Sequence, residues 1–181
     1  MASQGDPRVQ RLEEELARVR AAFDAVLDAA PAELLARPYA GGWSPAQVVW
    51  HLAKTERSIA RMIEAKVAAL GPMSTVPPGP RSDEVLSLLD HLPFLDRSRK
   101  ARAPEGLNPP DVIDLAAECV RLGEGRRQLL EVAYAAGPLL SNVRHDHPAF
   151  GPFNGWQWVL MVARHEQRHQ QQVEEALAGG R

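Results

Sequence analysis

The sequence predicts an all-α protein, a four-helix bundle in which one long crossover joins the second helix to the third. Apolar residues recur at spacings of three and four over about residues 7–30, 44–70, 111–136 and 154–179. Many of the prolines gather in 71–110, which therefore forms the crossover. Possible strands are too short to support a sheet, so the bundle is the simplest architecture.

Composition bounds the class of protein. With 181 residues, 45% of them hydrophobic and 24% charged, the chain is long enough for one domain, 1–181, with its own core. A net charge of −2 gives no support to nucleic-acid binding. No apolar run is long enough for a membrane span and no signal peptide is evident, so we expect a cytoplasmic protein that binds no membrane. The single cysteine, Cys119, is expected to be a buried structural thiol among helix formers.

The first two helices have recognisable starts. Asp6 is a good N-cap and Pro7 suits the first helical position, so the first helix begins there and is followed by a loop over 31–42. Ser44 and Gln47 have the spacing of a capping box at the start of the second helix, with Trp43 and Val48 placed as a hydrophobic staple. Such a start fixes the direction of the following turns. One of them carries His51 on the inward stripe, which continues through a further set of residues: Leu52, Thr55, Ile59, Met62 and Ile63.

The crossover and the third helix are less sharply marked. A short helix is expected over 82–91, with His91 at its C-terminal end as a dipole partner. The third helix is expected to begin at Asp111, and its predicted inward residues are Val112, Leu115, Ala116, Cys119, Leu122, Leu129, Leu130, Val132 and Ala133. Gly123 and Gly125 each cost about 1 kcal/mol relative to alanine inside a helix. They indicate a close helix approach or a local distortion.

The fourth helix repeats the entry of the second. A loop is expected over 139–153, after which Asn154 is the N-cap, Gln157 stands at the capping-box position, and Phe153 and Trp158 form the staple. On this helix Trp158, Val162, His165 and His169 share one stripe. Two histidines spaced i and i+4 on one face can share a metal ion.

The string from His165 to His169 also matches H-E-x-x-H, the zinc metalloprotease pattern in which the glutamate is general base. The extended pattern requires a glycine and a third histidine where this chain has Gln172 and Glu175. An all-helical chain also lacks the strand edges common in protease clefts. Both points argue against the protease interpretation.

A better third ligand lies upstream. If the second and fourth helices are neighbours, the imidazoles of His51, His165 and His169 can meet at one level. Three neutral nitrogen ligands leave a fourth position open, as in catalytic zinc sites, for a water or a substrate thiolate. Imidazole suits zinc, nickel, iron and copper alike, so the spacing does not choose the metal.

The order Trp43-Ser44-Pro45, His51-Leu52, His147-Pro148-Ala149-Phe150-Gly151, Trp158 and the run from His165 to Gln172 resembles the DinB-like (YfiT-type) superfamily over nearly the whole chain. The resemblance implies an up-down-down-up bundle, a homodimer, and a divalent metal held by His51, His165 and His169. It favours zinc or nickel, with iron as a further candidate. Family members with known activity include S-transferases and isomerases that use low-molecular-weight thiols, while many members have no assigned activity.

We therefore expect a metal-dependent enzyme acting on a small molecule, a thiol-dependent transferase before a hydrolase, with a non-catalytic metal-binding module as the competing class. Several roles stay open at this point. Glu166 is a base or an ion-paired carboxylate, and Gln172 orients a ligand or is an ordinary buried amide. Arg164 and Arg168 either attract an anionic substrate or are solvated. His145 and His147 form an H-x-H pair that is a second candidate for metal binding, although His147 before Pro148 is expected to pack at the start of the fourth helix. Four tryptophans are expected as core and staple residues rather than as a ligand-stacking box: Trp43, Trp50, Trp156 and Trp158.

Overall fold

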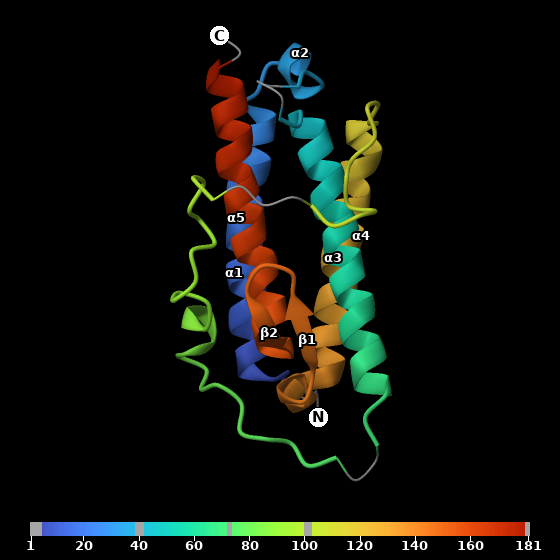
Figure 1. Cartoon of the computed structure of the whole chain (residues 1–181), viewed down its shortest axis with the longest axis vertical. Helices are drawn as coiled ribbons and strands as arrows, with labels where there is room; N and C mark the ends of the chain where they lie inside the picture. The colour runs from blue at the N-terminus through green and yellow to red at the C-terminus, as the bar shows by residue number, and fades with distance from the viewer. Residues whose placement is uncertain (1–4, 39–41, 72–73, 100–102, 180–181) are drawn as a thin grey trace.

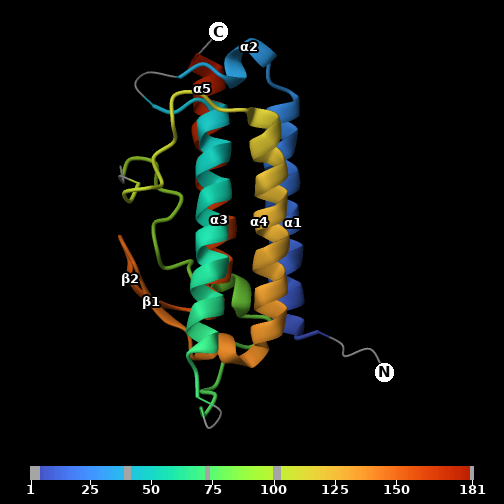
Figure 2. The same cartoon turned by 90° about the vertical axis from the view of Figure 1, so that its right-hand side faces the viewer.

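Four long helices lie lengthwise beside one another in the computed structural model, which describes residues 5–38, 42–71, 74–99 and 103–179 (Figures 1 and 2). They are α1 (Pro7–Asp28), α3 (Pro45–Ala68), α4 (Leu115–Ala136) and α5 (Gly155–Gly179). Helix α1 packs on α5 and α3 packs on α4, while α3 also contacts α5. The helical bundle predicted from the sequence is confirmed.

The path of the chain can be followed in Figure 1. The colour advances upward along α1 and α5 and downward along α3 and α4. The segment between α3 and α4 passes outside the helices and returns across α3 before α4 begins. This arrangement places α3 and α5, the two histidine-bearing helices, on neighbouring sides of the bundle.

The helix starts follow the predicted capping chemistry. The Asp6 carboxylate accepts the Arg8 N–H at 2.9 Å. At α3, the Ser44 hydroxyl accepts the Gln47 N–H at 3.2 Å and the Gln47 side chain accepts the Ser44 N–H at 2.9 Å, which completes the capping box. Asn154 and Gln157 exchange the same pair of hydrogen bonds at α5, both at 2.9 Å. Both histidine-bearing helices therefore start at fixed positions.

The first loop and the crossover both differ from the prediction. A short helix, α2 (Ala32–Leu35), lies within the expected first loop. In the crossover, the expected helix over 82–91 is wrong, because the chain forms turns there around a 3₁₀ helix, η1 (Val85–Ser87). Val85 and Leu89 are nonetheless buried. Their spacing therefore reflects packing of the turns on α1 rather than an α-helix, which is hard to nucleate in so short a segment.

Helix α4 begins later than expected, and its buried face matches the predicted one only in part: Leu122, Leu129 and Ala133 are buried as expected. Its cap is Asp114, which accepts the Ala117 N–H at 3.1 Å, and Val112 before it is 88% exposed. Cys119 is exposed, so the expectation of a buried thiol is wrong. The inward stripe also includes two charged residues, Glu118 and Arg126, which hydrophobic periodicity cannot detect.

The two glycines of α4 behave differently. At Gly125 a side chain would place its Cβ 3.5 Å from the Glu56 Cβ and 3.6 Å from the Ala53 carbonyl oxygen, so α3 and α4 approach closely there. A Cβ on Gly123 would meet nothing within 4 Å. The helix continues through both. The close helix approach is thus confirmed at Gly125, and no break of the helix accompanies either glycine.

The segment before α5 is more ordered than a loop. After a 3₁₀ helix, η2 (Gly137–Ser141), strands β1 (Arg144–His147) and β2 (Gly151–Asn154) pair antiparallel. The expectation that the chain forms no sheet is therefore wrong. Strands of four residues are too short to show an alternating pattern in the sequence. The hairpin is held by aromatic packing, with the His147 ring 5.2 Å from that of Phe153 and 5.6 Å from that of Trp158.

A layer of charge divides the apolar core. The larger apolar cluster includes Leu16, Ile59, Leu129 and Val162, and the smaller one lies toward the other end of each helix. Between them in sequence, each long helix contributes one residue to a network of linked ion pairs: Arg20, Glu56, Arg126 and Glu166. None of the described helices combines the length and apolar character needed to cross a membrane.

Candidate metal centre

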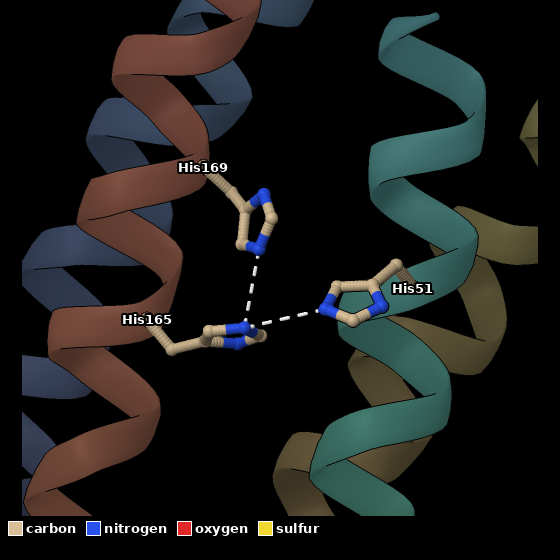
Figure 3. Close-up of side chains that lie close together, drawn as sticks. All are labelled: His51, His165 and His169. Atoms are coloured by element: carbon tan, nitrogen blue, oxygen red, sulfur yellow. Dashed lines mark hydrogen bonds between the residues drawn. The ribbon is translucent and has the colours of Figure 1, made fainter. Parts of the chain in front are cut away.

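Three imidazoles converge between α3 and α5 (Figure 3). His51 lies on α3 soon after its capped start, and His165 and His169 lie one turn apart on α5. The His165 Nε2 atom is 3.3 Å from Nε2 of His51 and 3.1 Å from Nε2 of His169. The structure therefore brings together the three histidines that the sequence singled out.

The separations suit a tetrahedral metal ion. Zinc lies about 2.0–2.1 Å from a histidine nitrogen, which places two ligands of a tetrahedron about 3.3–3.4 Å apart. Both of the Nε2 separations are close to this value, and the ligand atoms of the three residues all lie within 4.8 Å of one another. Among the described residues, no fourth histidine, cysteine or acidic side chain belongs to the group.

The hydrogen-bond partners of two Nδ1 atoms determine which nitrogen of each ring carries the proton. His51 Nδ1 lies 2.8 Å from the Leu107 carbonyl oxygen, and His169 Nδ1 lies 2.8 Å from Oε1 of Gln172. Both oxygens can only accept a hydrogen bond, so the facing Nδ1 atom carries the hydrogen. The Nε2 atoms of His51 and His169 therefore each present a lone pair. A proton on His165 Nε2 can form a hydrogen bond to only one of these two lone pairs. A cation between the rings would bind all three Nε2 atoms.

Burial keeps these histidines neutral. Desolvation lowers the pKa of His51, and desolvation together with the neighbouring histidines lowers the pKa of His165 well below its ordinary value. The pKa of His169 falls to about 3, first because of burial and then because of His51. All three are thus available as neutral ligands at neutral pH.

Trp43 lies against the same site. Its ring centroid is 4.8 Å from that of His51 and 6.1 Å from that of His169, nearly parallel to the latter. The side chain also packs on the apolar cluster that contains Val48, as expected of a staple residue. The staple therefore fixes the start of α3 and lines the metal centre, a second role that the capping pattern did not reveal.

Glu166 is turned away from the histidines. It is fully buried, and its carboxylate accepts hydrogen bonds from the guanidinium groups of Arg20 and Arg126. A carboxylate held in two buried ion pairs is not placed as the general base of the H-E-x-x-H pattern. Of the two roles left open for Glu166, the ion-paired carboxylate is the one found.

The other candidate side chains lie outside the centre. His147 packs on the aromatic rings of the hairpin and the start of α5, as expected. Arg164 donates to Glu15 and to the Leu86 carbonyl oxygen. Arg168 donates to three carbonyl oxygens of the crossover, those of Phe94, Asp96 and Arg99. Both arginines are thus occupied in holding the chain rather than in attracting an anion.

Fold and site together define a class of protein, a helical bundle with a buried cluster of three histidines between two helices. The model of the DinB superfamily matches residues 15–173, so the chain belongs to the DinB superfamily. A solved structure described as "TT2238, a four-helix bundle protein" has a TM-score of 0.57 and 22% identity, covering 92% of this chain and 98% of that one. This likeness supports the fold. None of the curated proteins matches the chain.

Proposed function

We propose that this protein is a metal-dependent enzyme acting on a small molecule, with a divalent cation held by Nε2 of His51, His165 and His169. One observation carries the proposal: three neutral imidazoles present their Nε2 atoms to one another, with adjacent separations of 3.3 and 3.1 Å. Two of the rings are held in that tautomer by oxygen acceptors. A proton on His165 Nε2 would satisfy only one of the two facing lone pairs, whereas a cation between the rings would satisfy all three Nε2 atoms.

Counted over the residues that the structure describes, the three ligands favour a catalytic role over a structural one. Structural zinc sites are closed by four protein ligands, whereas catalytic sites use three and keep a position for water or substrate. His165 is the least buried of the three histidines. We take its side of the cluster as the side from which a small molecule would reach the centre.

The reaction we propose is a thiol-dependent S-transfer or isomerisation with a low-molecular-weight thiol, as the resemblance to active members of the family implies. A bound cation would supply the Lewis acidity that makes a thiol or water nucleophilic at neutral pH. The protein's own part is to hold the imidazoles neutral, to orient two of them through Leu107 and Gln172, and to offer the apolar face of Trp43 beside them. Zinc or nickel is the expected metal, with iron as the further candidate.

Metal analysis tests the site, and it should use protein purified without a histidine tag. We expect His51→Ala to lose the metal that the wild-type chain carries, together with any consumption of a low-molecular-weight thiol in the presence of an electrophile. The matched control is His145→Ala, because His145 is exposed on the hairpin. Unchanged metal content in His51→Ala would contradict the proposal.

The same assays separate the alternatives. Metal binding with thiol-independent hydrolysis would favour a hydrolase, and metal binding without turnover would favour a non-catalytic module. The homodimer and the cytoplasmic location stay predictions, and light scattering on the purified protein tests the first.

A further inference from the structure

One segment outside the helices contacts the candidate metal centre directly. Residues 103–110 cross α3 just before α4 begins (Figure 1). The Leu107 carbonyl oxygen lies 2.8 Å from His51 Nδ1, and the Pro110 carbonyl oxygen accepts a hydrogen bond from the Gln47 side chain at 3.0 Å. The segment is thus attached to α3 through two main-chain oxygens, and one of these contacts the proposed metal ligand His51.

A tight turn aims the Leu107 carbonyl. The Leu107 N–H donates to the Pro104 carbonyl oxygen at 3.0 Å, and Gly106 has a φ of +83° at the third position of that turn. A positive φ at this position is the mark of a type II turn, which glycine adopts without strain. Gly106 is exposed and a Cβ there would meet nothing within 4 Å, so its backbone conformation alone calls for glycine.

The segment has little else to hold it. All of its residues are exposed or half-buried, and none belongs to either apolar cluster. Segments with few buried contacts open at low free energy. The hydrogen bond to His51 is therefore a large part of what keeps residues 103–110 on α3.

We propose that the turn at Gly106 positions His51 for the metal through the Leu107 carbonyl, and that the bound metal in return orders residues 103–110. This inference rests on the proposed metal site. A cation on Nε2 makes the Nδ1–H of the same ring a stronger donor, so its hydrogen bond to Leu107 strengthens. Metal binding and the ordering of residues 103–110 are therefore coupled. Such coupling is reciprocal, so a change that stabilises the ordered segment also raises metal affinity.

Hydrogen exchange on the full chain tests the ordering. Peptides covering 103–111 should exchange more slowly after addition of Zn²⁺ than in the metal-free protein, while peptides from the hairpin 144–154 should change little. Metal affinity, measured by calorimetry with Zn²⁺ alone, tests the positioning. Gly106→Ala should weaken binding by up to about tenfold, the lower end of the effect of losing an outer partner of a metal-bound histidine.

Gly151→Ala is the matched control. Gly151 has a φ of +79° and equally open surroundings, so both substitutions introduce similar backbone strain, but Gly151 lies in the hairpin. Equal Zn²⁺ affinity in Gly106→Ala and Gly151→Ala, or unchanged exchange of 103–111 on metal addition, overturns the inference and leaves the metal site standing. If the wild-type chain binds no Zn²⁺, Ni²⁺ or Fe²⁺, the proposed function fails and this inference fails with it. If Gly106→Ala does not fold, the hydrogen exchange of residues 103–111 in the wild-type protein, with and without Zn²⁺, decides whether the inference holds.

Discussion

At the scale of single residues, the candidate centre depends on which atoms face which. Helical spacing predicted the positions of His51, His165 and His169, because a residue's place on a helix face follows from its number. The partner of His51 could not be predicted in the same way. It is a main-chain oxygen of Leu107, and every residue carries such an oxygen. Only the nearby Gly106 hints at a special turn.

Gln172 gives a residue-scale prediction. Its side-chain oxygen is 2.8 Å from His169 Nδ1, so Gln172→Leu removes the acceptor that fixes the tautomer. We expect metal affinity to fall about 10- to 100-fold, as for other outer partners of metal-bound histidines. Competition with a chelator measures the change. Gln170→Leu is the control, since Gln170 donates to Glu174 instead, and equal losses in both variants would count against the orienting role.

His147 gives a prediction about pH. Burial lowers its pKa to about 4, so between its unfolded value near 6.5 and 4 the unfolded chain binds a proton that the folded chain does not. The stability it contributes is complete above about pH 6.5 and is lost as the pH falls. Linkage sets an upper limit of about 1.36 kcal/mol per pH unit, and this half-buried ring supplies only part of it.

Urea unfolding at about pH 7 and about pH 5 measures the effect of His147. His147→Phe keeps an aromatic ring against Phe153 and Trp158 but cannot titrate, so its free energy of unfolding should fall less between the two pH values than that of the wild type. Comparing the two falls, rather than taking either alone, separates the effect of this ring from what the two proteins share. An identical fall in both would show that His147 does not contribute.

At the scale of elements, the sequence was most informative about long helices and least informative about short segments. The starts of α1, α3 and α5 follow from side-chain caps, whose chemistry is local. The hairpin, the turns around Val85 and the late start of α4 depend on packing between distant segments. Local periodicity does not contain that information, so the hairpin was missed and a helix was expected where turns occur.

The cap of α3 gives an element-scale prediction. Ser44 is buried and accepts the Gln47 N–H, so Ser44→Ala should lower the free energy of unfolding by about 1 kcal/mol, within the usual range for N-caps. Ser58→Ala on the same helix is the control, because its exposed hydroxyl bonds only the Lys54 carbonyl oxygen. Chemical denaturation measures both. A loss no larger than that of the control would contradict the role of the cap.

At the scale of the whole molecule, the buried charges tie the four helices together. Arg126 on α4 contacts Glu56 on α3 and Glu166 on α5, each at 2.6 Å, and Arg20 on α1 contacts the same two carboxylates. Arg126→Met would leave two buried carboxylates with only one partner. We expect the free energy of unfolding to fall by about 3 kcal/mol or more in urea denaturation, the range for breaking a buried ion pair. A loss below that of Ser44→Ala would contradict this.

Replacing the whole layer separates stability from alignment. Arg20→Met, Glu56→Leu, Arg126→Met and Glu166→Leu together leave no unpaired charge, and apolar residues of similar volume often replace buried ion pairs without loss of stability. Apolar contacts are not directional, however, whereas the bridge through Arg126 fixes α3 against α5 at one register. His51 and His165 lie on those same two helices. We therefore expect the quadruple variant to unfold at a similar urea concentration but to bind Zn²⁺ more weakly. Wild-type affinity in a variant of wild-type stability would show that the charged layer plays no part in aligning the metal centre.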